Sequence, residues 1–177
     1  HVPSATVGDY DDMLVTLTAA TKTFNLAGLQ NSLIVIPDKT IRARFDAYLK
    51  KIRITPSNPM GYIAVEAAYR GGAAWAKECR RQIYENFELL RDTLAARAPK
   101  AVVSPLEGTY LMWVDLGAYV KAEEMKDFME RRCGLAVDYG EWFGGERFGT
   151  FIRLNLATSR ELVQAAADKL CAALEQC

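Results

Sequence analysis

A long amphipathic segment in the middle of the chain constrains the fold more than any other feature. Apolar side chains recur there at helical spacing, between the pair Gly71-Gly72 and Pro99. The members of this stripe are Cys79, Ile83, Phe87, Leu90 and Leu94. Since glycine and proline end helices, we expect one long connecting helix over residues 74–98. It divides the chain into a first domain, residues 1–73, and a second, residues 99–177.

The first domain is predicted to contain strands and helices in alternation. Residues 13–18 (MLVTLT) and 32–36 (SLIVI) indicate two short strands, the second of them buried. Asp38 can cap a helix, and the turn signal TPSNP at residues 55–59 ends it. The apolar positions of that helix are Ile41, Phe45, Leu49 and Ile52, and those of the next are Tyr62, Val65, Ala68 and Tyr69.

The second domain has a different order of predicted strands and helices. Strands are predicted at residues 101–104, 109–116, 135–139 and 150–157, with the glycine-rich loop EWFGGERFG between the last two. Met125, Phe128 and Met129 indicate a helix over residues 122–132. We expect two helices on one face of a small, mostly antiparallel sheet, which is an α+β unit.

A last helix closes the second domain. Thr158 and Glu161 form a capping-box pair at its start. Its predicted apolar stripe consists of Leu162, Ala166, Leu170 and Ala173.

Composition excludes several classes of function. The 22 basic and 22 acidic side chains cancel, so there is no electrostatic signature for nucleic acid or an anionic membrane. The longest apolar runs are too short to span a bilayer. The four cysteines are scattered without metal-ligand spacing, which favours a reduced, cytoplasmic setting. The only histidine is His1, which rules out a Ser-His or Cys-His catalytic pair within this chain.

Lys22 is the first candidate for chemistry, because it follows a predicted strand in the segment TAATKTFNLAGLQ. Ligand crevices in open α/β sheets lie outside the carboxyl ends of strands. Nearby threonine hydroxyls could bond a phosphate, and lysine can attack a carbonyl when its pKa is lowered. The combination suits pyridoxal phosphate, which requires a lysine partner. The alternative is a solvated loop lysine, which residue type alone favours.

Arg153 is the second candidate. Alternation along TFIRLNLA places Phe151, Arg153 and Asn155 on one face of a strand, opposite a core face with Ile152. An arginine there could hold a carboxylate through a bidentate fork, although a simply solvated face is the alternative. Trp142 and Phe143 in the glycine-rich loop could wall a pocket or pack locally.

Together these residues carry a resemblance. The chain resembles the C-terminal portion of a fold-type I pyridoxal-phosphate enzyme of the class I/II aminotransferase superfamily, and most closely the cystathionine β-lyase (C–S lyase) branch. The segments that carry it are TLTAATKTFNLAGLQ, ITPSNPMGYIAVEAAY, EGTYLMWVDL and GLAVDYGEWFGGERFGTFIRLNLATSR, in the order of the family. The resemblance implies a fold between α/β and α+β: the distal part of the cofactor-binding large domain, followed by a small C-terminal domain.

The resemblance also implies roles for individual residues. Lys22 matches the lysine that forms a Schiff base with the cofactor, and Thr21, with Thr18, stands near the cofactor phosphate. Arg153 matches the arginine that binds the substrate α-carboxylate, and Tyr139 lies in a segment near the substrate.

Two departures from the family pattern affect these roles. Ala20 replaces a usual proline, which loosens the turn without removing chemistry. Gln30 stands where the aspartate aminotransferase branch has a phosphate-binding arginine, which argues against that branch.

The family's acidic partner of the pyridinium nitrogen, its stacking tyrosine and its phosphate loop all precede the matched segments. We therefore expect this chain to bind pyridoxal phosphate weakly by itself. The implied full-length protein is a homodimeric lyase that acts on a sulfur-containing amino acid and releases thiol, pyruvate and ammonia. Transamination uses the same residues and remains an alternative. A further alternative is a non-catalytic interaction domain, in which the long helix serves self-association.

Overall fold

The computed structural model describes residues 2–54 and 58–177. It divides into two compact units, His1–Ala76 and Lys77–Cys177, and each is described by itself. The division falls inside helix α3, Ala73–Arg97, which is the long helix predicted from the apolar stripe. Its start matches the glycine pair and its end precedes Pro99, so the predicted helix is confirmed.

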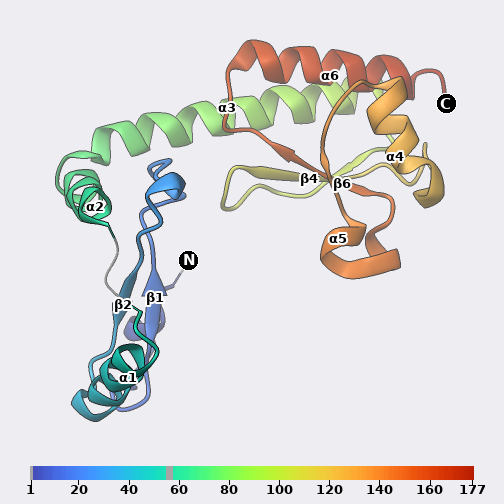
Figure 1. Ribbon diagram of the computed structural model, residues 1–177. Helices are drawn as coiled ribbons and strands as arrows, with labels where there is room; N and C mark the ends of the chain where they lie inside the picture. The colour runs from blue at the N-terminus through green and yellow to red at the C-terminus, as the bar shows by residue number, and fades with distance from the viewer. Residues whose placement is uncertain (1, 55–57) are drawn as a thin grey trace. The chain divides into compact units, whose positions relative to one another are not determined.

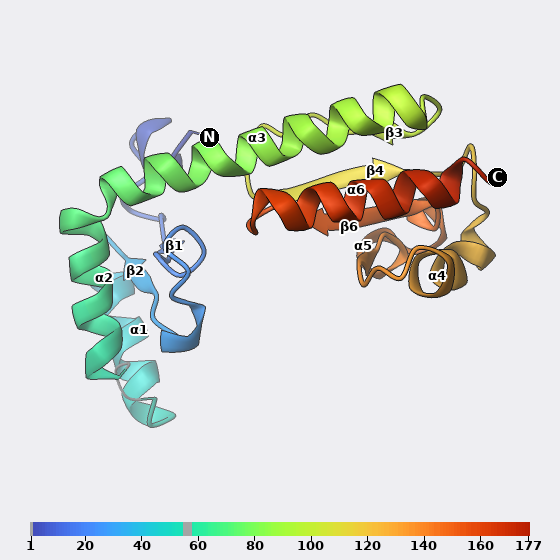
Figure 2. The same cartoon turned by 90° about the horizontal axis from the view of Figure 1, so that it is seen from above.

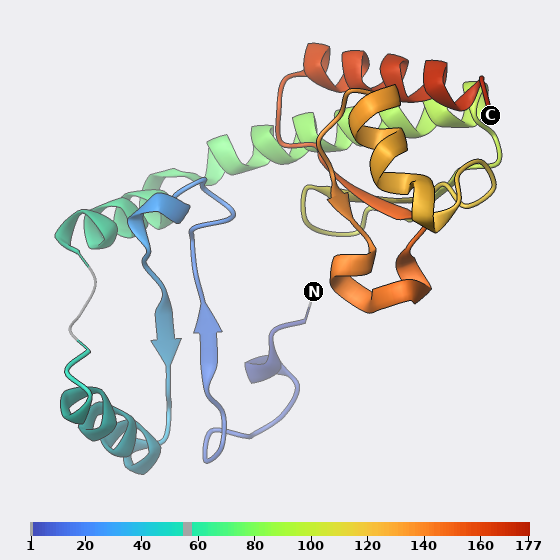
Figure 3. The same ribbon diagram turned by 45° about the vertical axis from the view of Figure 1, so that its right-hand side comes forward.

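The first unit is built around a two-stranded ribbon. Strand β1, Thr16–Thr18, pairs antiparallel with β2, Leu33–Val35, with Thr16 opposite Val35 (Figures 1 and 3). Single 3-10 turns occur at Ser4–Thr6 and Ala27–Leu29. Helices α1, Lys39–Lys51, and α2, Pro59–Gly71, follow the ribbon and precede the start of α3.

The helices of the first unit begin at side-chain caps. Asp38 caps α1 as predicted, because its carboxylate accepts a hydrogen bond of 2.7 Å from the backbone N–H of Ile41. Asn58 caps α2 in the same way, accepting 2.8 Å from the N–H of Gly61. Of the predicted turn at residues 55–59, residues 55–57 lie outside the described residues.

The prediction that the second strand is buried was wrong for this chain. All three residues of β2 are exposed, and Val35 is 52% exposed. The apolar sequence of the strand was interpreted as a core signal, but a ribbon of two strands has no covering layer over these residues in the first unit. Burial depends on what packs against a strand, which its own residues do not specify.

The second unit contains a four-stranded sheet in the order β3-β4-β6-β5, in which every pair is antiparallel. The strands are β3, Val102–Val103, β4, Leu111–Asp115, β5, Asp138–Tyr139, and β6, Phe151–Asn155, each shorter than predicted. Helices α3 and α6, Arg160–Leu174, lie side by side over one face of this sheet (Figures 1 and 2). The predicted antiparallel sheet is confirmed. The prediction counted the helix at residues 122–132 and the last helix as the pair on one face, whereas the pair that lies there is α3 and α6.

The hydrophobic core of the second unit lies between those helices and the sheet. Its fully buried side chains come mainly from α3, β4, β6 and α6, and include Leu94, Met112, Ile152 and Leu170. At the end of α3, Arg97 forms ion pairs with Asp168 (3.1 Å) and Glu175 (2.8 Å) of α6 and its C-terminal end. These contacts fix the two helices against each other at the rim of the core.

The two short helical segments of the second unit are irregular. The helix predicted at residues 122–132 consists of a 3-10 turn, Ala122–Glu124, one α-turn, α4, Met125–Asp127, and a π-helical turn, Phe128–Arg132. The glycine-rich loop contains a short helix, α5, Glu141–Gly144, and a 3-10 turn, Gly145–Phe148.

The start of α6 differs from the prediction by one residue. Ser159, not Thr158, is the cap, and its hydroxyl accepts from the N–H of Leu162 at 3.4 Å. Of the predicted apolar stripe, Leu170 and Ala173 are buried, whereas Leu162 is 62% exposed and Val163 is buried instead. Helix α6 carries two overlapping apolar stripes, and the tertiary contacts of its N-terminal end select between them. No helix within residues 2–54 and 58–177 is both long enough and apolar enough to cross a membrane.

Candidate functional site

Lys22 lies in a tight turn after β1. The turn is closed by two backbone hydrogen bonds, from Phe24 to the carbonyl of Ala20 (3.0 Å) and from Leu26 to that of Thr21 (2.8 Å). The Lys22 side chain is exposed, and its ε-amine has no hydrogen-bond or ion-pair partner among residues 2–54 and 58–177. The amine is therefore accessible to an electrophile.

Phe24 anchors this turn to the first unit. Its ring stacks on Trp75 (centroids 6.0 Å apart) and meets the edge of Tyr69 (6.2 Å) at the junction of α2 and α3. A Cβ at Gly72 would lie 2.4 Å from the Phe24 ring, so the close approach requires glycine there. The importance of Phe24 was not recognised from the sequence, although an aromatic residue two positions after the lysine was visible.

The segment that leaves the turn is tied to the start of α2. The Asn58 side-chain amide donates to the backbone carbonyl of Leu29 at 2.8 Å. Gly61 allows this close approach, because a Cβ at residue 61 would lie 3.2 Å from the Leu29 carbonyl oxygen. Asn31 is buried beside Gly61, and neither polar atom of its side chain has a hydrogen-bond partner among the described residues. Two separate contacts, at Phe24 and at Leu29, thus hold the segment that follows Lys22.

The two predicted phosphate-binding threonines lie in the same unit as Lys22. Thr21 is half-buried within the turn, and Thr18 is exposed at the end of β1, opposite Leu33 of β2. The first unit thus contains an accessible primary amine and, close to it in the sequence, two hydroxyls. A primary amine can bond an aldehyde, and hydroxyls can donate to a phosphate, so these residues fit one part of a pyridoxal-phosphate site.

Arg153 lies in the second unit, on the face of the sheet that the prediction gave it. Phe151, Arg153 and Asn155 share this face, whereas Ile152 is fully buried on the other. Arg153 stands directly opposite Asp138 in the β5–β6 pairing. Its Nε and Nη2 both donate to Asp138 Oδ2, at 3.0 and 2.7 Å. The neighbouring Asn155 does not join this arrangement, because its side chain accepts from the backbone N–H of Ala157.

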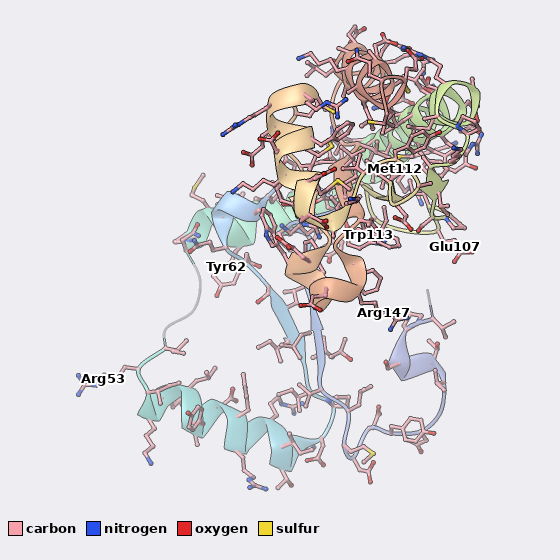
Figure 4. The ribbon with its side chains drawn as sticks, turned by 90° about the vertical axis from the view of Figure 1, so that its right-hand side faces the viewer. Arg53, Tyr62, Glu107, Met112, Trp113 and Arg147 are labelled. Atoms are coloured by element: carbon pink, nitrogen blue, oxygen red, sulfur yellow. The ribbon has the colours of Figure 1, made fainter. Side chains whose placement is uncertain are left out.

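Aromatic rings support the guanidinium. The Phe143 ring centroid lies 4.2 Å from Arg153 Cζ, a cation–π contact. Trp113 of β4 meets the edge of Phe143 (5.8 Å) and stacks on Phe151 (5.6 Å). Figure 4 shows Trp113 beside the ribbon of α5, which carries Phe143. Of the two loop aromatics singled out in the sequence, Phe143 is therefore the one that contacts Arg153.

Tyr139 lies on the opposite face of the sheet from Arg153. Its side chain is 6% exposed in the core, and its hydroxyl donates to Glu130 Oε1 at 3.1 Å. Burial, together with the Glu130 carboxylate, raises the pKa of Tyr139 to about 12. The structure thus gives Tyr139 a packing environment and does not bring it together with Arg153. Asp138, one residue earlier, is the functional candidate that sequence reasoning missed.

A groove of the second unit lies away from Arg153. It has a volume of about 710 Å³ and lies along α3 and α6, where its lining includes Glu88, Asp92, Arg160 and Gln164. None of the residues around Arg153 lines it. Lys22 and Arg153 belong to different units, and each is described within its own.

Comparison with known proteins supplies a family context. No family model matches the chain. The chain is 34% identical over 176 residues to cystathionine β-lyase PatB of Bacillus subtilis, covering 98% of the chain and 45% of that protein. The structure of cystalysin from Treponema denticola, which contains pyridoxal 5′-phosphate, is 32% identical with a TM-score of 0.86 and covers 94% of the chain and 42% of its own.

A more distant structure shares the fold alone. An aminotransferase from Mycobacterium tuberculosis is 19% identical, with a TM-score of 0.80 over 92% of the chain and 42% of its own. The mixed α/β chain therefore aligns to part of the aminotransferase fold, and it spans about 45% of the length of PatB.

Proposed function

We propose a function from the premise that this chain is a homologue of the cystathionine β-lyases and C–S lyases, which are pyridoxal-phosphate enzymes of fold-type I. The homology predicted from the sequence is confirmed. We infer that the chain contributes the catalytic lysine and the carboxylate-binding arginine of a carbon–sulfur β-lyase. The observation that carries this inference is the Lys22 turn, in which Phe24 anchors the backbone that bears an accessible amine.

The residues of the chain have distinct tasks in this proposal. Lys22 would hold the cofactor, with Thr21 and Thr18 as hydroxyl donors to its phosphate. Once the substrate amino group takes the place of Lys22, the ε-amine would be free to accept the proton from Cα of the substrate. Arg153 orients the substrate through its α-carboxylate. When bound, the cofactor supplies an electron sink for the charge left on Cα. The β C–S bond then breaks, thiolate leaves, and hydrolysis yields pyruvate and ammonia.

We propose the distal part of the cofactor-binding large domain for residues 1–73 and the small C-terminal domain for residues 99–177, with residues 74–98 as the connecting helix. As in the sequence interpretation, we also propose a cytoplasmic homodimer with a sulfur-containing amino acid as substrate. The relatives that support this assignment are named as cystathionine β-lyases.

The reaction is tested on the intact protein with L-cystathionine as substrate. We expect release of thiol and pyruvate, loss of activity in Lys22→Ala, and a fall in kcat/KM of about 100-fold in Arg153→Ala, because the substrate loses its orientation. Exchange of the amino group with a keto acid, without thiol release, would instead identify an aminotransferase, which uses the same residues.

For the 177-residue chain alone, we propose weak binding of pyridoxal phosphate. The support is that the chain spans about 45% of the length of PatB, while Lys22 and its threonines fit only one part of the cofactor. Titration with pyridoxal phosphate, followed by visible absorption, should show little difference between the wild-type chain and Lys22→Ala. A strong absorption that disappears in Lys22→Ala would contradict weak binding and support a largely complete site.

A further inference from the structure

The Lys22 side chain is held in place only through its backbone. The side chain is exposed, and its ε-amine has no hydrogen-bond or ion-pair partner among residues 2–54 and 58–177. Because lysine has a long flexible stem, no contact of the amine restricts where it points. The residues that fix the backbone of the turn therefore determine where the amine can reach.

A left-handed residue closes the turn that bears Lys22. The backbone N–H of Leu26 donates to the carbonyl of Thr21 at 2.8 Å, and this hydrogen bond encloses Lys22. Asn25, the residue before the donor, has φ +55°. Such a bond is typical of a helical turn that ends in a left-handed residue, as at the C-terminal ends of many helices. The conformation of Asn25 thus closes the loop of backbone in which Lys22 lies.

Asn25 contributes to the turn through its backbone. Its side chain is exposed and makes no hydrogen bond among the described residues. Positive φ is costly for a residue with a Cβ, which then crowds the following carbonyl oxygen; glycine avoids the clash, and asparagine tolerates it better than most. A β-branched side chain fits this conformation worst. Position 25 therefore requires a residue that accepts positive φ, whereas the amide group itself is dispensable.

The anchor of the turn lies directly before Asn25. The Phe24 ring stacks on Trp75 and occupies the space left by the absent Cβ of Gly72. Because the chain reverses immediately after Phe24, the ring stays against Trp75 while the segment continues to Leu29, which is tied to the start of α2. A change of φ at residue 25 would displace the backbone from one of these two contacts, and Lys22 would move with it.

We propose that Asn25 is a positioning residue for Lys22, which acts by holding the turn closed through its left-handed backbone. The inference rests on the proposed function, in which the Lys22 amine accepts a proton from the substrate. A displaced amine slows this proton transfer, whereas binding of the substrate carboxylate by Arg153 does not depend on the turn. Loss of the left-handed conformation should therefore lower kcat much more than it changes KM.

The test compares Asn25→Gly with Asn25→Val in the intact protein, with L-cystathionine as substrate. Both variants lose the amide, but only glycine accepts positive φ without strain. Asn25→Gly should keep kcat within about twofold of wild type. Asn25→Val should lower kcat by about 100-fold and change KM by less than about threefold, since a displacement of about 1 Å can cost that much.

Two spectroscopic measurements do not depend on turnover. The visible absorption of the bound cofactor, and its change with pH, should be those of wild type in Asn25→Gly and shifted in Asn25→Val. In the 177-residue chain without cofactor, the Leu26 amide should exchange about tenfold faster in Asn25→Val than in wild type, because its hydrogen bond to Thr21 is weakened. Its exchange should be unchanged in Asn25→Gly.

Arg53→Val is the matched control. Arg53 has the same φ of +55°, belongs to the same unit and lies at the end of α1, outside the Lys22 turn (Figure 4). The variant places the same β-branched side chain on a left-handed backbone, and it should leave kcat and the visible absorption unchanged. An equal loss of kcat in Arg53→Val and Asn25→Val would overturn the proposal, because general destabilisation would then explain both.

The other outcomes separate this inference from the proposed function. If Lys22→Ala is inactive but Asn25→Gly and Asn25→Val have equal kcat, the role of Asn25 is overturned while the proposed function stands. Activity that persists in Lys22→Ala would reject the proposed function, and this inference with it. Should Asn25→Val fail to fold, Asn25→Ala, which is less strained, should lose about tenfold in kcat. An Asn25→Ala variant indistinguishable from Asn25→Gly would overturn the role of Asn25.

Discussion

At the scale of single residues, Asp138 and Tyr139 are neighbours on β5 with opposite environments. Alternation along the strand sends Asp138 to Arg153 and Tyr139 into the core, where its hydroxyl donates to Glu130. The phenol is thus buried beside a carboxylate, and both effects disfavour its ionised form.

Replacement of Tyr139 by phenylalanine should change how stability depends on pH. The pKa of Tyr139 is about 12 in the folded chain, whereas an unfolded tyrosine ionises near pH 10. Below pH 10 both states keep the proton. Between pH 10 and 12 only the unfolded state releases it, so the wild-type free energy of unfolding falls as the pH rises. In Tyr139→Phe this part of the fall should be absent.

The measurement is urea unfolding at pH 8 and pH 11, followed by circular dichroism. At pH 8, Tyr139→Phe should cost about 0.5–1.5 kcal/mol for the lost hydrogen bond. Tyr84→Phe, which removes an exposed phenol from α3, should leave the wild-type pH dependence intact. An equal fall in wild type and Tyr139→Phe would show that the Tyr139 phenol ionises normally.

The contrast between Asp138 and Tyr139 also shows which features of the site can be predicted from the sequence. The alternation of TFIRLNLA correctly predicted which face carries Arg153, because a strand has a fixed period of two. Asp138 could not be selected as the partner of Arg153, nor Tyr139 excluded, because the register between β5 and β6 is set by packing. Opposite charges on two predicted strands were the only available signal.

At the scale of elements, the junction of α2 and α3 supports the Lys22 turn. Two adjacent glycines separate the helices, and they have different surroundings. A Cβ at Gly72 would lie 2.4 Å from the Phe24 ring and 2.5 Å from the carbonyl oxygen of Ala68, whereas a Cβ at Gly71 would meet nothing within 4 Å. The two glycines therefore allow a matched test of whether the Phe24 ring must pack closely against the backbone at residue 72.

Gly72→Ala should destabilise the chain by about 1–3 kcal/mol, because either the ring or the helix end must move. Gly71→Ala, at the last position of α2, should be neutral or stabilising by up to about 1 kcal/mol, since alanine favours helix. Urea unfolding of the two variants, followed by near-ultraviolet circular dichroism, gives the comparison. Equal destabilisation would mean that both positions need glycine for backbone reasons alone.

Helix boundaries were predicted correctly where residues next to the boundary determine it. Asp38 and the glycine pair determine helix ends through nearby backbone groups, and both were predicted. The start of α6 was not predicted correctly, because a tertiary contact lies beside it. The buried side-chain amide of Asn86 in α3 donates to the carbonyls of Leu156 and Thr158, each at 3.0 Å. That contact joins residues 70 and 72 positions apart, and no local pattern contains it.

At the scale of the whole molecule, the two units differ in how much apolar surface they bury. Among the described residues, the buried apolar side chains of the first unit are Ala20, Ile36 and Val65, whereas 21 form the core of the second. Leu17 on β1 is 72% exposed. Since burial of apolar surface is the main stabilising contribution, the unit with Lys22 should be much the less stable.

Hydrogen exchange of the 177-residue chain tests this difference directly. Amides of β1 and β2 should exchange about 100-fold or more faster than those of β4 and β6, because local opening costs less where few side chains are buried. Equal protection of the β1–β2 amides and the β4–β6 amides at low protein concentration would contradict this expectation. Protection of β1 and β2 that grows with protein concentration would instead favour self-association, with their exposed apolar residues as the contact surface. In that case the isolated chain would act as an interaction module. Weak protection of β1 and β2 at every protein concentration would instead attribute the proposed weak cofactor binding to instability of the Lys22 unit itself.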